Sequence, residues 1–128
     1  MKRPTKGFGS RLGRPTTKSK PLPAVRQIEF EKRLCEAIRM LVRVELRYDD
    51  DTAFRLIEPT ALYESSPGKI TLAGTQVVNP AEPPESFEPR NFEVGRIVAL
   101  RLTDNRFVPD FRFDPRDRKY KLGILCSI

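Results

Sequence analysis

The stretch that decides the fold reads RVELRYDDDTAFRLIEP over residues 43–59. Its first six residues alternate between charged and apolar side chains, which is the pattern of a strand with one buried face. Asp49, Asp50 and Asp51 then favour a turn, and a second strand begins near Phe54. The sequence therefore predicts a β-hairpin. Three acids without spacing are more typical of a solvated turn than of a metal site.

One amphipathic helix is expected before this hairpin, over residues 25–42. After the hairpin, short strands alternate with turn residues such as Pro67 and Gly68, and residues 79–89 read as an acidic, proline-rich loop. One helix followed by many short strands predicts a mainly β fold, either a small barrel or a strongly bent sheet. The expected strands are Ala61 to Tyr63, Lys69 to Ala73, Thr75 to Val78, Phe92 to Leu102 and Phe107 to Phe113, and the apolar helix positions are Phe30, Leu34, Ala37, Ile38 and Leu41.

Length and composition favour one small domain. The chain has 128 residues, of which 38% are hydrophobic, and no apolar run approaches the ~18 residues of a membrane-spanning helix. Its basic start is not followed by the apolar stretch of a signal peptide, so we expect a cytoplasmic protein. Cys35 and Cys126, in a chain without histidine, match neither a disulfide framework nor a metal site. We expect both to be reduced thiols.

Charge is concentrated at the N-terminus. Residues 1–28 hold eight of the 24 basic side chains and no acid, which leaves one net negative charge on the remainder. Pro, Gly, Ser and Thr dominate this segment, so the sequence predicts a disordered basic tail over residues 1–24 and a folded domain over residues 25–128. Such a tail favours nucleic acid over a membrane surface, and the alternative is a solubilising tail. The expected phosphate contacts are Arg11, Arg14, Lys18 and Lys20.

One short motif in the tail suggests DNA. Gly13, Arg14 and Pro15 resemble the centre of an AT-hook, which lies in the minor groove of A/T-rich DNA. The match is partial, because Leu12 stands where that motif usually has a basic residue. A chance match in a tail of simple composition is the alternative.

Arginines also occupy positions inside expected strands. Arg55 lies within residues 53–59, and Arg90 and Arg96 lie within residues 90–100. A guanidinium keeps its proton when it is buried, so each needs a carboxylate, an anionic ligand or water. Strand alternation predicts an anion pocket, because it places two arginines on one face with five apolar residues, the set being Arg90, Phe92, Val94, Arg96, Val98, Leu100 and Leu102.

Two structural alternatives apply to these arginines. Gly95 can form a bulge that turns Arg96 to solvent. Internal pairing of Arg96 is the other alternative, with Glu58, Asp104 or Asp114 as the expected partner. Arg47 lies on a polar face, whereas Arg55 shares its face with Ile57 and Pro59, which gives Arg55 the stronger functional argument.

The order of several short motifs resembles a WYL domain over residues 29 to about 120. The family's namesake triplet is the point of departure, because Ile70 and Thr71 replace its two aromatic residues and Leu72 alone is kept. The matching motifs, in order, are Arg47-Tyr48, Arg55-x-Ile57-x-Pro59-x-x-Leu62-Tyr63, Gly68-Lys69-Ile70-Thr71-Leu72-Ala73-Gly74, Arg90-x-Phe92-x-Val94-x-Arg96-Ile97 and Phe107-x-Pro109.

This resemblance implies an Sm-like or SH3-like barrel that acts as a sensor and binds a nucleotide or single-stranded nucleic acid. Such domains usually regulate transcription or modulate helicases and CRISPR effectors. The positions that would contact the ligand are Arg55, Arg90 and Arg96, with Arg47 and Tyr48 as weaker candidates. DNA contact is expected from the tail or from a partner protein.

Catalysis has little support in the sequence. The chain has no histidine, and its acids are scattered without a spacing that would set two of them opposite one another. We therefore expect a non-enzymatic protein without a cofactor or metal. Two hypotheses remain. The first is a ligand-responsive module that takes part in transcriptional regulation. The second is a degenerate barrel that serves protein–protein interaction or forms a homodimer.

Overall fold

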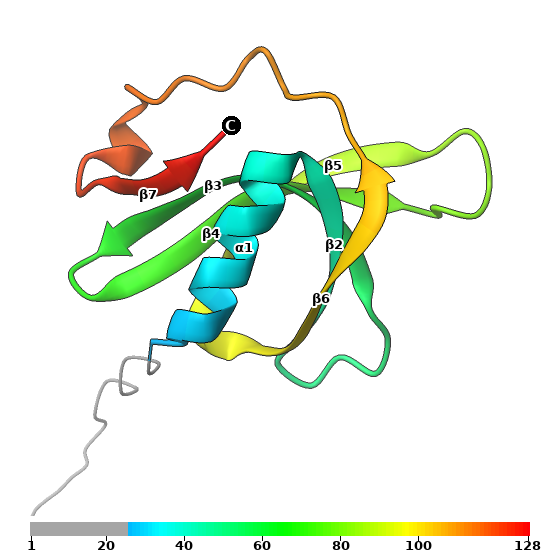
Figure 1. Cartoon of the computed structure of the whole chain (residues 1–128), viewed down its shortest axis with the longest axis horizontal. Helices are drawn as coiled ribbons and strands as arrows, with labels where there is room; N and C mark the ends of the chain where they lie inside the picture. The colour runs from blue at the N-terminus through cyan, green and yellow to red at the C-terminus, as the bar shows by residue number, and fades with distance from the viewer. Residues whose placement is uncertain (1–25) are drawn as a thin grey trace, which may run out of the picture.

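One helix and six strands build the part of the chain that the computed structural model describes, residues 26–128 (Figure 1). The mainly β prediction is confirmed. The predicted tail over residues 1–24, with its AT-hook-like motif, lies outside the described residues. The elements are α1 (Ile28–Met40), β2 (Val42–Tyr48), β3 (Arg55–Ser66), β4 (Lys69–Val78), β5 (Ser86–Glu93), η2 (Val94–Arg96), β6 (Ile97–Arg106), η3 (Arg118–Tyr120) and β7 (Ile124–Ser127).

Helix α1 packs its apolar stripe inward, as the sequence predicts. Leu34, Ala37 and Ile38 are buried. The helix ends at Met40 because Leu41 adopts a left-handed conformation with φ 57° and ψ 45°, and its N–H bonds back to the carbonyl oxygens of Ala37 and Ile38. It is thus shorter than expected. No helix within residues 26–128 is both long and apolar enough to cross a membrane.

The strands form one antiparallel sheet in the order β5-β4-β3-β2-β6, and β7 pairs with β3 beside this row. Strand β3 is shared: its residues 55–57 pair with β2, and its residues 61–63 pair with β7. A register shift between Pro59 and Ala61 on β3 separates the two halves. The sheet curves around α1 (Figure 1). Within residues 26–128 no pairing joins β5 to β6, so the barrel type stays a prediction.

Two apolar clusters lie on opposite faces of the sheet. The larger one fills the space between α1 and the sheet, and Tyr48 packs against its margin. The smaller one includes Tyr63 and Tyr120, and the chain between β6 and β7 covers it. Strand residues alternate between the two, since Leu62 and Leu72 belong to the first cluster while Ala61, Tyr63 and Ala73 belong to the second.

Some predicted strands are wrong. The expected strand over residues 107–113 contains no regular structure, whereas β7, which has only four residues, was not predicted. The expected acidic loop is also shorter, because residues 86–89 belong to β5. Proline is tolerated there since β5 is an edge strand, and Pro89 therefore removes no donor from a central ladder.

A disulfide joins Cys35 of α1 to Cys126 of β7, so the predicted reduced thiols are wrong. The two cysteines are 91 residues apart in sequence, but the sheet brings β7 beside the helix and leaves their Cα atoms 5.7 Å apart. The spacing of the two cysteines in the sequence does not predict this disulfide, because the disulfide depends on the pairing of β7 with β3.

Candidate functional site

The structure brings together three of the five arginine and tyrosine positions that the sequence selects. Tyr48 ends β2, Arg55 begins β3, and Arg96 lies in the short helix η2. All three lie at the end of the sheet where the hairpin of β2 and β3 turns. Arg47 and Arg90 lie elsewhere, as described below.

Two guanidinium groups and two rings form a row that we call the arginine–aromatic ladder, made of Arg96, Tyr48, Phe92 and Arg55. The guanidinium carbon of Arg96 lies 5.2 Å from the ring centre of Tyr48, and that of Arg55 lies 5.7 Å from the ring centre of Phe92. The two rings meet edge to face with their centres 5.2 Å apart. The hydroxyl of Tyr48 accepts a 3.0 Å hydrogen bond from the backbone N–H of Glu93, which fixes this ring.

The hairpin turn supplies an acid to each arginine of the ladder. Asp51 accepts hydrogen bonds from Nε and Nη2 of Arg55 at 2.7 and 3.0 Å. Asp49 accepts from Nε of Arg96 at 2.8 Å and from its Nη2. The expectation of a merely solvated turn is thus wrong for these two acids. The hydrogen bond from Arg55 lowers the pKa of Asp51, and the hydrogen bonds to the acids raise the pKa of Arg55 and Arg96.

The helical turn η2 redirects Arg96. The side chains of Val94 and Ile97 are buried, with 1% of each exposed, whereas 52% of Val98 is exposed. The predicted single face from residue 90 to residue 102 is therefore wrong, because Val94 to Arg96 form a turn of 3₁₀ helix that resets the alternation. Arg96 leaves the apolar face, as the Gly95 alternative anticipates. Its partner is Asp49 and none of the three acids expected from the sequence.

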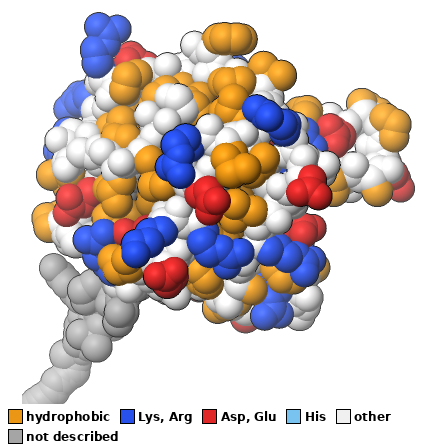
Figure 2. All heavy atoms as spheres, in the orientation of Figure 1, with side chains coloured by type: hydrophobic (Ala, Val, Ile, Leu, Met, Phe, Trp, Pro, Cys, Tyr) orange, Lys and Arg blue, Asp and Glu red, His pale blue; other side chains and the backbone are white. Residues whose placement is uncertain are grey.

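Both ladder arginines keep donors for a ligand. A guanidinium carries five N–H groups, and the pairing with aspartate uses the edge formed by Nε and Nη2. No acceptor of residues 26–128 bonds to Nη1 of Arg96, and Nη1 of Arg55 donates a long hydrogen bond of 3.4 Å to Gln76. A hollow of about 410 Å³ beside the hairpin turn is lined by Arg55, Phe54 and Gln76, among others. Figure 2 shows a row of basic side chains, with acids between them, across the face that carries α1.

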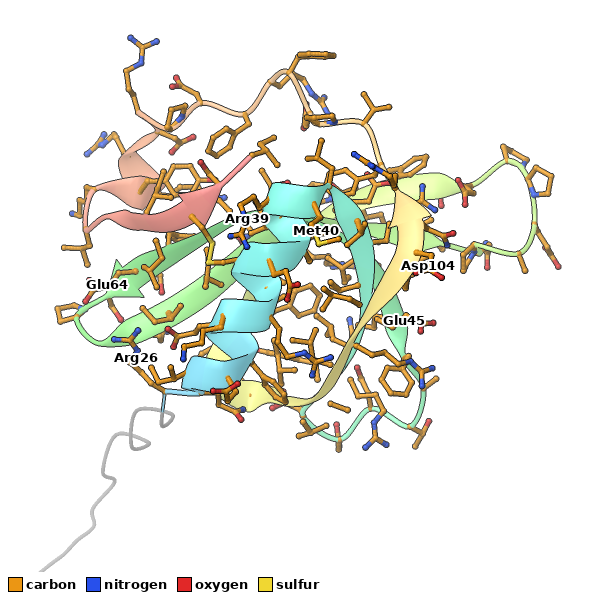
Figure 3. All side chains as sticks on the ribbon, viewed as in Figure 1. Arg26, Arg39, Met40, Glu45, Glu64 and Asp104 are labelled. Carbon is orange, nitrogen blue, oxygen red and sulfur yellow. A yellow bond between two sulfur atoms is a disulfide. The ribbon has the colours of Figure 1, made fainter. Side chains whose placement is uncertain are left out.

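Arg47 belongs to a second contact on the outer side of β2. Its guanidinium carbon lies 5.7 Å from the ring centre of Phe54, and that of Arg101 lies 4.0 Å from the same ring. Nε of Arg47 is buried without a hydrogen-bond partner in residues 26–128. Arg101 pairs at 2.8 Å with Glu45, which projects outward from β2 in Figure 3. Sequence reasoning missed Arg101, because only the register of β2 against β6 places it opposite Glu45.

Arg90 is separated from the ladder. It lies on β5 opposite Gly74, borders a different hollow, and pairs with Glu88 at 2.7 Å. Each of the three arginines that the sequence emphasises is therefore paired with an acid. The tail positions Arg11, Arg14, Lys18 and Lys20 lie outside the described residues.

The site contains no obvious metal centre. Within residues 26–128, no group of three or more acids or cysteines is placed to hold a metal ion. Its chemistry is that of cations on aromatic faces, which suits the binding of an anionic, planar ligand. No protein-family model, curated protein or solved structure matches this chain.

Proposed function

We propose that this domain is a non-enzymatic regulatory module that binds a nucleotide or a single-stranded nucleic acid through the arginine–aromatic ladder. The observation that carries the proposal is the pair of guanidinium groups held on the rings of Tyr48 and Phe92, each with an edge that no acid of residues 26–128 occupies. Asp49 and Asp51 fix the orientation of these groups, and these edges supply donors to a phosphate.

Bases would stack on the guanidinium planes. Arginine planes are common stacking surfaces for unpaired bases. Ile70 and Thr71, which stand where WYL domains have two aromatic residues, offer no stacking surface for a base. Ile70 is buried in the core, and the hydroxyl of Thr71 lies 2.7 Å from that of Ser65. Phosphate contact thus contributes more than base recognition, and we expect little sequence preference.

The resemblance to WYL domains supports the same assignment, and we propose that the chain is a divergent member. Arg55, Arg96 and Tyr48 occupy matching positions of that family and meet in the ladder. Arg90 is left out of the proposed site because it borders a different hollow. A role in transcriptional regulation, with phosphate contacts from the basic tail, completes the proposal. The expected cytoplasmic location is not part of it, because the disulfide between Cys35 and Cys126 is of a kind that is rare in the cytosol.

Fluorescence anisotropy with labelled oligothymidylate tests this function. Arg55→Ala and Arg96→Ala should each weaken binding by about tenfold or more. Each should also reduce the slope of log affinity against log salt concentration by about one, the value for one phosphate contact. Arg116→Ala is the matched control, because Arg116 is also paired with a nearby aspartate but lies far from the ladder in the chain. Circular dichroism checks that each variant is folded.

Three results would contradict the proposal. Unchanged affinity of both ladder variants would remove the ladder from the site. Loss of all binding on deletion of residues 1–24 alone would assign binding to the tail. Absence of binding at low salt would favour the protein-interaction alternative.

A further inference from the structure

A second hollow, of about 150 Å³, lies on the opposite face of the sheet from the ladder. Its floor is formed by β4 and β5, and the chain between β6 and β7 forms its other wall. It borders the smaller apolar cluster, whereas Tyr48 and Phe92 of the ladder belong to the larger one. A ligand in this hollow would therefore contact none of the ladder residues.

Aromatic rings form one wall of this hollow. Phe113 and Tyr120 both line it, with their ring centres 5.7 Å apart. Tyr63 supports Tyr120 from behind through an edge-to-face contact with centres 4.9 Å apart. Burial raises the pKa of both tyrosines, so their hydroxyls stay neutral near pH 7 and do not repel an anion.

Three cations line the hollow, and within residues 26–128 Lys119 is the one without an ion pair, since Arg90 pairs with Glu88 and Arg112 pairs with Asp110, which also lines it. Its Nζ lies 5.3 Å from the ring centre of Tyr120 and 5.6 Å from that of Tyr63. No carboxylate of residues 26–128 lies within ion-pair distance of it, although Lys32 and Lys69 both have such partners. An ammonium group held over rings without a counter-charge favours an anion from solution.

A repeated turn fixes the basic residues of this segment. Asp110, Asp114 and Asp117 each accept a hydrogen bond from the backbone N–H two residues later, at 2.9, 2.9 and 3.0 Å. Each residue that donates this N–H is basic, and two of them, Arg112 and Lys119, line the hollow. Arg116 occupies the same position in the remaining turn but does not line it, which provides a matched comparison.

We propose that this hollow binds a small planar aromatic anion, whose ring lies against Phe113 and Tyr120 and whose charged group meets Lys119. The volume suits one ring, because a cavity of about 150 Å³ holds a molecule the size of benzene. Thr75 and Asn91 line the floor and offer neutral hydrogen-bonding groups to the same ligand. The charged group can be a carboxylate or a phosphate, since an ammonium group binds both.

Titration of the isotope-labelled full chain with benzoate and with phenyl phosphate, followed by amide NMR spectra, tests the proposal. We expect saturable shifts at Thr75, Asn91 and Lys119, and the stronger of the two ligands identifies the charged group. Cyclohexanecarboxylate and inorganic phosphate are the comparison probes and should bind at least about tenfold more weakly, because they lack the ring that packs on the aromatic wall. Equal binding of either comparison probe would overturn the aromatic part of the proposal.

Substitutions then locate the site. Lys119→Ala should weaken binding by about tenfold or more, whereas Arg116→Ala should leave it unchanged. Equal effects of the two variants would show that general charge is responsible and would overturn the proposal. Arg96→Ala should not alter benzoate binding, and Lys119→Ala should not alter oligothymidylate binding, so that failure of one site is distinguished from failure of the other.

Discussion

Replacing Cys35 and Cys126 together with alanine should lower the free energy of unfolding by about 4.6 kcal/mol. The bridge closes a loop with a sequence separation of 91, and this value is the conformational entropy that a cross-link over such a loop removes from the unfolded chain near room temperature. For a domain of this size the same loss corresponds to a decrease of roughly 20 °C or more in Tm.

Urea unfolding followed by circular dichroism measures this effect. The oxidised chain, the chemically reduced chain and the Cys35→Ala/Cys126→Ala variant should fall into two groups, with the oxidised chain alone unfolding at high urea. The slope of the transition should also be steeper without the bridge, because a chain freed of its cross-link exposes more surface on unfolding. The reduced chain controls for the change of side chain, since it keeps both cysteines.

Equal transition midpoints for the oxidised and reduced chains would refute the entropic argument. Titration of free thiols in the unreduced protein provides a separate check. Two reactive thiols in the folded state would contradict the bridge itself.

Other substitutions test the core, the ladder and a close backbone contact. Leu62→Ala should cost about 2–5 kcal/mol in urea unfolding, because the side chain is fully buried. Gly74→Ala should lower Tm, because a Cβ atom would lie 2.8 Å from the carbonyl oxygen of Glu58, which belongs to the backbone. The lowered pKa of Asp51 stabilises the fold above the ordinary aspartate range, and this contribution is lost as the pH falls through the lowered value. Acid unfolding should therefore require less acid in Asp51→Asn, whereas the exposed neighbour in Asp50→Asn should change it little.

Local patterns predicted the elements that depend on neighbouring residues. The stripe that includes Leu34 and Ile38 gave the helix, and the alternation of residues 43–48 gave β2. Strand β7 escaped prediction because its four residues are stabilised by pairing with β3, which lies far away in sequence. The disulfide escaped for the same reason.

In the candidate site, too, the sequence predicted local features but not the contacts between residues far apart in the chain. Charge and alternation identified Arg55 and Arg96 as unusual, but the pairing of Arg96 with Asp49 depends on how η2 meets the end of β2. Asp49 accepts the side chain of Arg96 and donates its own N–H to the backbone carbonyl of Arg96 at 2.9 Å. No sequence period relates residues that are 47 positions apart.

The open edge of β5 bears on how the protein behaves at high concentration. An unpaired strand invites a second copy to extend the sheet, which is a common route to aggregation. Pro89 has no N–H to offer such a neighbour, and the charged side chains of Glu88 and Arg90 flank it along an exposed strand. A second copy that extended the sheet would have to pack beside this ion pair, and it would find no backbone N–H at Pro89 to bond to. The edge that leaves the sheet unclosed is thereby protected against self-association through its backbone.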